Sequence, residues 1–166
     1  MPVSLYSASV PVFVRMLKNL VGLLDKAEAY ARDRGFDPTV LVTSRLAPDM
    51  FPLSFQIQSA TDRAKYFASR VTGRDAPAWP DEEKTLDDLK ARLRKAIDYL
   101  STFTESDFLG QDEKVVTLKN RSGETQVSAQ DYLLNNAHPN FYFHVTTAYD
   151  ILRHNGVPVG KRDFVG

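Results

Sequence analysis

Apolar residues recur at alternating spacings of three and four along three long stretches of the chain. This period places their side chains on one stripe of a helix surface. It predicts helices over residues 10–31, 53–71 and 86–103. Matched stripes need a shared apolar interior, so we expect these helices to pack against one another.

Capping residues fit the ends of the three predicted helices. Ser9 is suited to begin the first helix, and Gly35 and Gly73 are suited to end the first and the second. Asp81, followed by the acidic residues 82–83, is expected to begin the third helix, because carboxylates are favoured in a first turn.

A proline-rich segment, residues 36–52, separates the first two helices. Its prolines make a continuous helix unfavourable, so we expect a long ordered crossover that wraps across the helix ends. Several of its side chains are too apolar to be left in solvent: Leu41, Val42, Leu46, Met50 and Phe51.

The period changes after the third helix. Residues 114–127 hold two short strand-forming stretches on either side of a Gly-containing turn, which predicts a small β-hairpin. Ser128, with Asp131 three residues later, is typical of a helix start. A fourth helix is expected from there to Gly156, with a kink or restart at Pro139. Its apolar positions are Tyr132, Leu133, Leu134, Phe141, Val145, Ala148 and Leu152.

Together these elements predict an all-α fold: an antiparallel four-helix bundle with a long crossover after the first helix and a small β-hairpin before the fourth. The tail, residues 157–166, is apolar enough that we expect it to dock somewhere on the rest of the chain. Trp79 lies in a loop where we expect it to be exposed. A length of 166 residues fits a single domain over residues 1–166.

Composition narrows the possible functions. Lysine plus arginine equals aspartate plus glutamate at 21 each, so we expect no long-range field that gathers nucleic acid or an anionic membrane. The chain has no cysteine, which excludes a thiolate nucleophile and a cysteine zinc site. The sequence has neither a secretory signal nor a membrane-spanning stretch, and we expect a soluble, cytoplasmic protein.

The chain has three histidines, all in or beside the predicted fourth helix. At 100° per residue they point in different directions, so they cannot form a three-histidine site within one chain. His154 falls in the last turn, where the helix dipole favours an imidazolium. His138 precedes Pro139 and is expected to bond a carbonyl group that the proline leaves free.

His144 has polar neighbours one and two turns earlier on the same helix, at Asn140 and Asn136. Polar side chains on an inward face need partners. This row is therefore either a buried hydrogen-bond network that fixes the helix register or a surface that faces a small molecule or a metal ion.

The second helix offers three polar residues for the opposite side of that row: Gln56, Gln58 and Asp62. Asp62 is the one carboxylate among them. It lies opposite the seam formed by Ala60 and Ala64, so it faces inward only if this helix is buried on more than one side.

Other motifs are weak. The sequence has no G-x-S-x-G elbow and no glycine-rich phosphate loop. Asp88 and Arg92 stand four apart and are expected on the solvent side of the third helix. The basic residues of that helix alternate with acids and form no stripe for nucleic acid.

Three segments carry a family resemblance: SLYSASVPVFVRMLKNL near the start, RLAPDMFPLSFQIQ in the crossover and PNFYFHVTTAYDILRHNGVPVGKRDF near the end. Over essentially its whole length the chain resembles an uncharacterised branch of the DinB-like (DinB/YfiT) superfamily. The resemblance implies a four-helix bundle and a homodimer. Many members hold nickel or zinc with one histidine from the second helix and an H-x-x-x-H pair from the fourth, and some are transferases or isomerases that use low-molecular-weight thiols.

On this resemblance, His144 looks like the second histidine of the pair, twelve residues before Gly156. Asn140 stands in the place of the first histidine, and Gln58 or Asp62 would replace the ligand from the second helix. Zinc and nickel favour nitrogen donors over an amide oxygen, so the set is expected to hold a divalent metal weakly or not at all. The expected ligand site is His144, Asn140, Asn136, Gln58 and Asp62, with His144, Asn140 and Asp62 as the metal ligands.

Two functions from different classes follow. The first is a pocket around His144, either in a variant metal-dependent transferase or isomerase or in a metal-free protein that binds a small molecule. The second is a non-catalytic, homodimeric interaction protein with a degenerate metal site, suggested by the apolar tail and by Trp79.

Overall fold

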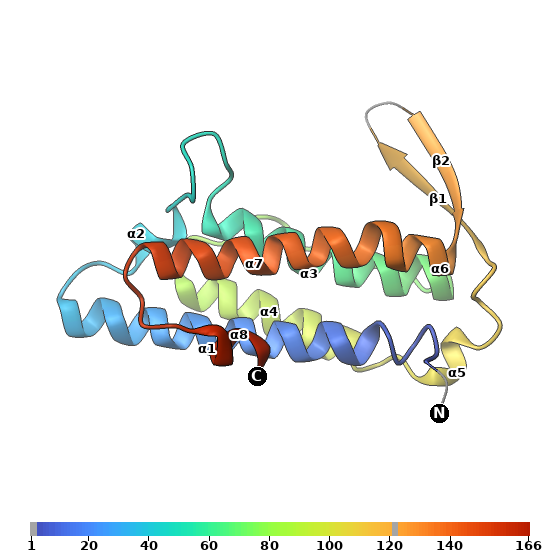
Figure 1. Ribbon diagram of the computed structural model, residues 1–166, viewed down its shortest axis with the longest axis horizontal. Coiled ribbons are helices and arrows are strands. Elements are labelled where there is room, and N and C mark those ends of the chain that lie inside the picture. The colour runs from blue at the N-terminus through green and yellow to red at the C-terminus, as the bar shows by residue number, and fades with distance from the viewer. Residues whose placement is uncertain (1–2, 121–122) are drawn as a thin grey trace.

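The computed structural model describes residues 3–120 and 123–166. Within them the chain is mostly helical, and its four longest helices lie side by side with a two-stranded β-hairpin at one end (Figure 1). The long helices are α1 (Val10–Arg34), α3 (Leu53–Thr72), α4 (Leu86–Leu100) and α7 (His138–His154). The shorter elements are α2 (Thr39–Val42), α5 (Glu105–Phe108), β1 (Val115–Asn120), β2 (Gly123–Ser128), α6 (Ala129–Tyr132), the π-helix η1 (Leu133–Ala137) and α8 (Lys161–Val165).

The apolar stripes predicted from the sequence meet in one core, and those of the first three predicted helices are buried throughout. Phe13 of α1 contacts Phe67 of α3 and Phe141 of α7 edge-on, with ring centroids 5.9 and 4.7 Å apart. Leu134 departs from the fourth stripe and is 53% exposed. It lies in η1, whose wider turn shifts the direction of the side chains.

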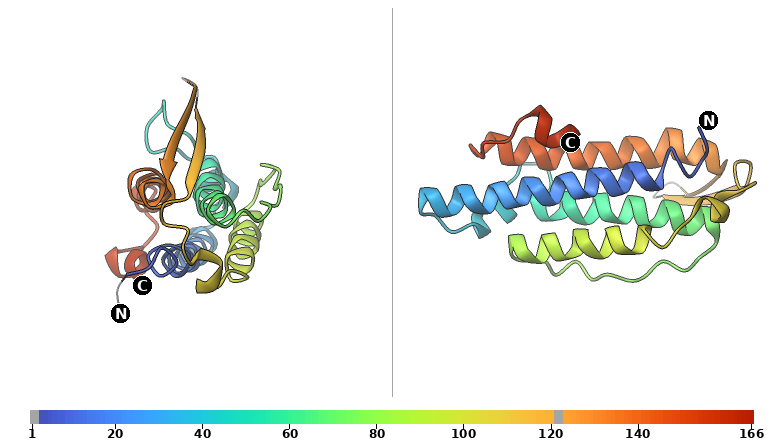
Figure 2. Two further views of the ribbon diagram at one scale, coloured as in Figure 1. Left: turned by 90° about the vertical axis from the view of Figure 1, so that its right-hand side faces the viewer. Right: turned by 90° about the horizontal axis from the view of Figure 1, so that it is seen from below.

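The helices do not simply alternate in direction. Residues 73–85, here called the strap, return along the outside of the helices, and α4 therefore runs in the same direction as α3 (Figure 2). An extended strap at about 3.3 Å per residue is long enough to pass a helix of about 30 Å. The expectation of a wholly antiparallel arrangement is wrong for this pair, because an apolar stripe has the same period in either direction.

The start of α4 differs from the expected one. Leu86, not Glu82, begins the helix, and Thr85 rather than Asp81 caps it. Thr85 Oγ1 accepts a hydrogen bond from the backbone N–H of Asp88 at 3.1 Å, and the Asp88 carboxylate accepts one from the N–H of Thr85 at 2.9 Å. This reciprocal capping box satisfies two free N–H groups, so it defines the first turn.

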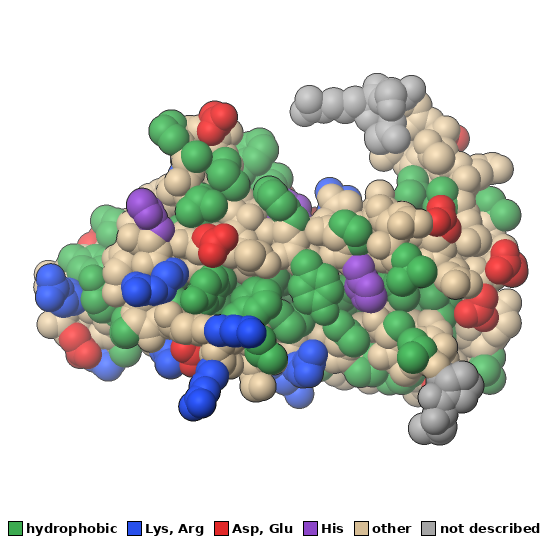
Figure 3. Space-filling view, viewed as in Figure 1, with side chains coloured by type: hydrophobic (Ala, Val, Ile, Leu, Met, Phe, Trp, Pro, Cys, Tyr) green, Lys and Arg blue, Asp and Glu red, His purple; other side chains and the backbone are tan. Residues whose placement is uncertain are grey.

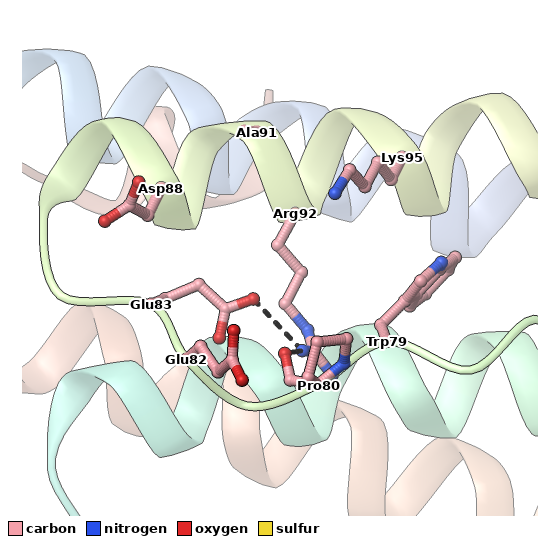
Figure 4. A pocket seen from close by; sticks show the side chains of 8 residues that line it. All are labelled: Trp79, Pro80, Glu82, Glu83, Asp88, Ala91, Arg92 and Lys95. Atoms are coloured by element: carbon pink, nitrogen blue, oxygen red, sulfur yellow. Dashed lines mark hydrogen bonds and ion pairs between the residues drawn. The ribbon is translucent and has the colours of Figure 1, made fainter.

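Arg92 of α4 is buried at 2% exposure, although the sequence pattern placed it toward solvent. It flanks the apolar stripe and is covered by the strap. Its guanidinium group donates to Thr61 at 2.9 Å and pairs with Asp62 at 3.2 Å, Asp81 at 2.9 Å and Glu83 at 3.1 Å. Figure 4 shows the side chain reaching from α4 to the strap. Arg92 thus fixes the strap to α3 and α4.

Trp79 of the strap is half-buried, contrary to the expected exposure. Its ring contacts Tyr99 edge-on, with centroids 6.2 Å apart, and the ammonium group of Lys65 lies 4.3 Å from its centroid. The indole therefore packs within the chain.

The tail docks on α1, as predicted. Val157 is fully buried. Asn19 of α1 donates to the backbone oxygen of Phe164 at 2.9 Å, and Lys26 pairs with Asp163 at 2.7 Å. These contacts hold α8 along the middle of α1.

The loop that joins α2 to α3, residues 43–52, rises from the side of the molecule that also carries the hairpin (Figure 1). Leu41 and Val42, just before this raised loop, are buried as expected. Phe51, at its end, is 58% exposed and stacks on Phe55, so the expectation that Phe51 is covered is wrong. Phe51 packs on the ring of Phe55 at the surface rather than in the core.

The hairpin and the following helix start confirm their predictions. β1 and β2 are antiparallel, with Val116 opposite Val127, and the turn expected between them includes residues 121–122, which lie outside the described ones. Ser128 Oγ accepts from the N–H of Asp131 at 3.1 Å and caps α6. The chain then passes through η1 and restarts as α7, with Pro139 in its first turn. Among the described helices, none has the length and apolar character needed to cross a membrane.

The burial of Arg92 predicts that Arg92→Ala destabilises the fold strongly, because it leaves several carboxylates without their counter-charge. We expect the free energy of unfolding to fall by about 3 kcal/mol in urea denaturation. Arg94→Ala, on the exposed side of the same helix, is the matched control and should cost less than about 0.5 kcal/mol. Equal losses in the two variants would contradict the proposed role of Arg92.

Candidate functional site

The polar residues of α3 lie on two opposite faces. Residues seven apart fall almost on one line along a helix, and Gln56, Arg63 and Arg70 form such a line. Gln58 and Lys65 form a second line, rotated from the first by roughly 160°. The first line faces α7, η1 and the hairpin, and the second faces α4 and the strap.

Gln58 and Asp62 belong to the second face, so their expected place beside His144 is wrong. The amide nitrogen of Gln58 donates to Glu83 of the strap at 2.8 Å. The Asp62 carboxylate pairs with Lys65 at 2.8 Å and with Arg92 at 3.2 Å. The attraction of the two buried cations holds this carboxylate away from α7.

Gln56 is the residue of α3 that meets His144. His144 is 9% exposed, and its Nδ1 lies 2.8 Å from Gln56 Oε1. The amide nitrogen of Gln56 donates to the backbone oxygen of Phe51 at 2.9 Å, which leaves Oε1 as the acceptor. Nδ1 of His144 therefore carries the proton, and its Nε2 presents a lone pair.

The imidazole of His144 stays neutral. Burial, and then the positive charge of Arg63, lower the pKa of His144 to about 4. Its Nε2 has no hydrogen-bond partner in the described part of the chain, where no side-chain nitrogen or oxygen is both buried and unpaired. Nε2 is therefore open to solvent as a hydrogen-bond acceptor.

A cleft of about 540 Å³ lies between α3, η1 and the hairpin, and its lining reaches Asn140, one turn of α7 before His144. The surface is hollowed between the hairpin and the raised loop (Figure 3). Asn136 and Asn140 line the cleft, and the amide nitrogen of Asn140 donates to the backbone oxygen of Asn136 at 2.7 Å. The other lining residues are Arg63, Arg70, Leu118, Lys119, Thr125, Val127, Asp131, Tyr132 and Asn135.

Arg63 and Arg70 differ from Arg92 in what surrounds them. Within residues 3–120 and 123–166, neither has a carboxylate within ion-pair distance, whereas Arg92 has three. Arg70 donates to the phenol oxygen of Tyr132 at 3.0 Å. The other cation of the cleft, Lys119, is already paired with Glu124 at 3.0 Å.

Tyr132 adds a neutral donor to the cleft. Burial raises the pKa of its phenol, so the hydroxyl keeps its proton. Its oxygen accepts from Arg70, and its own hydrogen is left to bond an acceptor. Arg63, Arg70 and Tyr132 thus present donors to one cavity.

The other two histidines lie outside the cleft. His138 Nε2 is 2.9 Å from the backbone oxygen of Ala8, so it ties α7 to the segment before α1 rather than bonding a carbonyl freed by Pro139. His154 is exposed and ends α7, at the place expected from the sequence.

The side chains of the cleft do not fit the nickel or zinc ion that the family resemblance implies. His144 offers one free imidazole nitrogen, Asn140 offers an amide oxygen, and Asp62 faces the other side of α3. The guanidinium group of Arg63, close enough to lower the pKa of His144, would repel a cation there. The described residues contain no group of three histidine, aspartate or glutamate side chains able to hold a metal ion.

The sequence-based search missed the two arginines and Tyr132. Arg63 and Arg70 follow Gln56 at spacings of seven, so all three share the face that meets α7. That spacing could have found them once Gln56, and not Asp62, was chosen as the partner of His144.

The neutral state of His144 predicts a pH-dependent loss of stability. The pKa of His144 rises from about 4 in the folded chain toward 6.5 on unfolding. Between these pH values the unfolded chain binds more protons than the folded chain, so the free energy of unfolding decreases as the pH is lowered. Between pH 7 and 4.5, the free energy of unfolding should fall by about 2 kcal/mol more in the natural protein than in His144→Asn. The substitution keeps a donor for Gln56. Urea denaturation at both pH values checks this, and parallel losses in the two proteins would contradict it.

Comparisons with known proteins agree with the resemblance seen in the sequence. The family model described as a domain of unknown function, DUF1993, matches residues 5–165. The crystal structure of a DinB family member protein from Shewanella denitrificans is similar, with 43% sequence identity and a TM-score of 0.92, over 98% of this chain and 92% of that one. No curated protein matched. The chain therefore belongs to the DUF1993 family, an uncharacterised DinB-like branch.

Proposed function

We propose that this protein binds a small organic anion, a carboxylate or a phosphate, in the cleft between α3, η1 and the hairpin, without a metal ion. The observation that carries this proposal is the pair Arg63 and Arg70. Both guanidinium groups line one cavity, and neither has a carboxylate partner in the described chain. The four long helices, as the bundle of a DinB-like protein, provide the rigid frame for the cleft.

The spacing of the two arginines suits an extended anion. Seven residues of helix separate their Cα atoms by about 10.5 Å along the axis. A guanidinium group matches a carboxylate or phosphate with two parallel hydrogen bonds. The two guanidinium groups can therefore each bind one anionic group of the same molecule, or both bind a single phosphate.

The attraction is local. Three cations and one carboxylate line the cleft, although the whole chain has no net charge. The carboxylate, Asp131, accepts a hydrogen bond from Asn135. An anion in the cleft would also find the hydroxyl of Tyr132 as a donor.

The state of His144 favours binding over acid–base catalysis. A group with a pKa of about 4 is a poor proton acceptor at neutral pH. Its Nε2 is better suited to accept a hydrogen bond from a ligand. This supports the metal-free binding protein over the variant metal-dependent transferase or isomerase.

The alternative, a non-catalytic interaction protein, has less support. The tail contacts α1, and Trp79 contacts Tyr99 and Lys65, so both features that suggested a partner surface already make contacts within the chain. The homodimer stays a prediction.

Titration with inorganic phosphate and with citrate, at constant ionic strength, tests the proposed site. In two-dimensional ¹H–¹⁵N spectra, we expect concentration-dependent shifts at Arg63, Arg70 and Tyr132. Each of Arg63→Gln and Arg70→Gln should weaken binding about tenfold, because each removes a charge-assisted hydrogen bond.

Arg94→Gln, which removes an exposed arginine of α4, is the matched control and should leave binding unchanged. Shifts scattered over the whole surface, or equal weakening by all three substitutions, would refute a specific anion site.

A further inference from the structure

Exposed aromatic rings gather around His144. Phe51 and Phe143 are 58% and 55% exposed, which is unusual for such large apolar side chains. Phe51 stacks on Phe55 with centroids 4.1 Å apart, and Phe55 meets the His144 ring edge-on at 6.1 Å. Phe143 meets the same ring edge-on at 5.4 Å. We call Phe51, Phe55 and Phe143 the aromatic wall.

One amide group holds both the wall and the imidazole. Gln56 donates to the backbone oxygen of Phe51 and accepts from Nδ1 of His144. Arg45 adds a second bond to the raised loop, to the backbone oxygen of Met50 at 2.8 Å. The exposed position of Phe51 is therefore built by specific contacts and does not result from a loose loop.

His144, which contacts two rings of the wall, has one polar side-chain atom without a partner among the described residues, Nε2. As a neutral acceptor between apolar rings, it suits an O–H or N–H group carried by an otherwise apolar part of a ligand. A carboxylate, which has only acceptor oxygens when ionised, does not match this atom.

The wall lies about one turn of α7 beyond the lining of the anion cleft. Asn140, which lines the cleft, precedes His144 by one turn of α7. Arg63 lines the cleft and is near enough to His144 for its charge to act on the imidazole. The hollow in the surface runs from the hairpin toward the raised loop (Figure 3). Hydrophobic side chains gather around the raised loop.

We infer that the aromatic wall is a second subsite of the same cleft and that the ligand is an aromatic acid: its anionic group binds Arg63 and Arg70, its ring packs on the wall, and a ring O–H or N–H donates to Nε2 of His144. This inference rests on the proposed anion site. The ligand must be a small amphipathic molecule, because the site offers guanidinium groups at one end and aromatic rings, with the acceptor Nε2 of His144 beside them, at the other. The cleft of about 540 Å³ takes the anionic end of such a molecule, and the ring reaches past it to the wall.

A matched series of probes tests the inference: propionate, 3-phenylpropionate and 3-(4-hydroxyphenyl)propionate. Binding is measured by the same ¹H–¹⁵N titrations at pH 7. The ring should tighten binding about tenfold over propionate, because it is transferred from water to the wall. The hydroxyl should add about threefold more through Nε2.

Variants separate these contributions. Phe51→Ser and Phe143→Gln, both at exposed positions, should reduce the gain from the ring, while Leu109→Ser, also exposed but outside the wall, should not. His144→Asn should remove the gain from the hydroxyl and keep the gain from the ring.

Two failures are distinguishable. If phosphate binds through Arg63 and Arg70 but the ring brings no gain, the aromatic subsite is overturned and the anion site stands. If the aromatic acids bind through Phe51 and Phe143 but neither arginine affects their binding or that of phosphate, the proposed anion site is overturned, and with it the inference that one ligand spans both subsites.

Discussion

The fold and the cleft both depend on the division of the polar residues of α3 between two opposite faces. On one face, Asp62 pairs with Arg92 and Gln58 donates to Glu83 of the strap, so the strap is held over the helices. On the other, Gln56 orients His144 of α7, and Arg63 and Arg70 line the cleft without a carboxylate partner among the described residues. The apolar positions of α3 are buried in the core between these two faces. The polar side chains of one face therefore cannot reach the partners of the other. One helix therefore carries a closed ion-pair network for stability and, on the opposite face, the arginines that we propose bind the ligand.

The two faces use arginine in opposite ways. Arg92 is surrounded by carboxylates, so its charge is already balanced and it has no need of a further anion. Arg63 and Arg70 keep their charge unbalanced beside a cavity. The same contrast explains why the metal site implied by the family does not fit here. The carboxylate that could have served as a ligand is committed to Arg92, and a cation stands near His144 in its place.

The sequence was sufficient for features with a local cause. Apolar stripes, the hairpin and the cap at Ser128 follow from spacing and turn chemistry, and the polar row ending at His144 follows from helical periodicity. Features set by tertiary contacts were out of reach. The strap decides that Arg92 is buried and that α4 runs parallel to α3, and no periodicity encodes the path of a loop. The rotation of α3, which selects Gln56 over Asp62, is likewise fixed only by packing on both faces.

In the proposed function, the cleft of this DinB-like protein binds an anion with a pair of guanidinium groups and without a divalent metal ion. Elemental analysis of the untagged protein tests this most directly, since a histidine tag would itself bring nickel. After growth with nickel and zinc in the medium, the protein should contain both at well below one ion per chain, and His144→Ala should not change the content. One equivalent of either metal in the natural protein, lost in His144→Ala, would contradict a metal-free site.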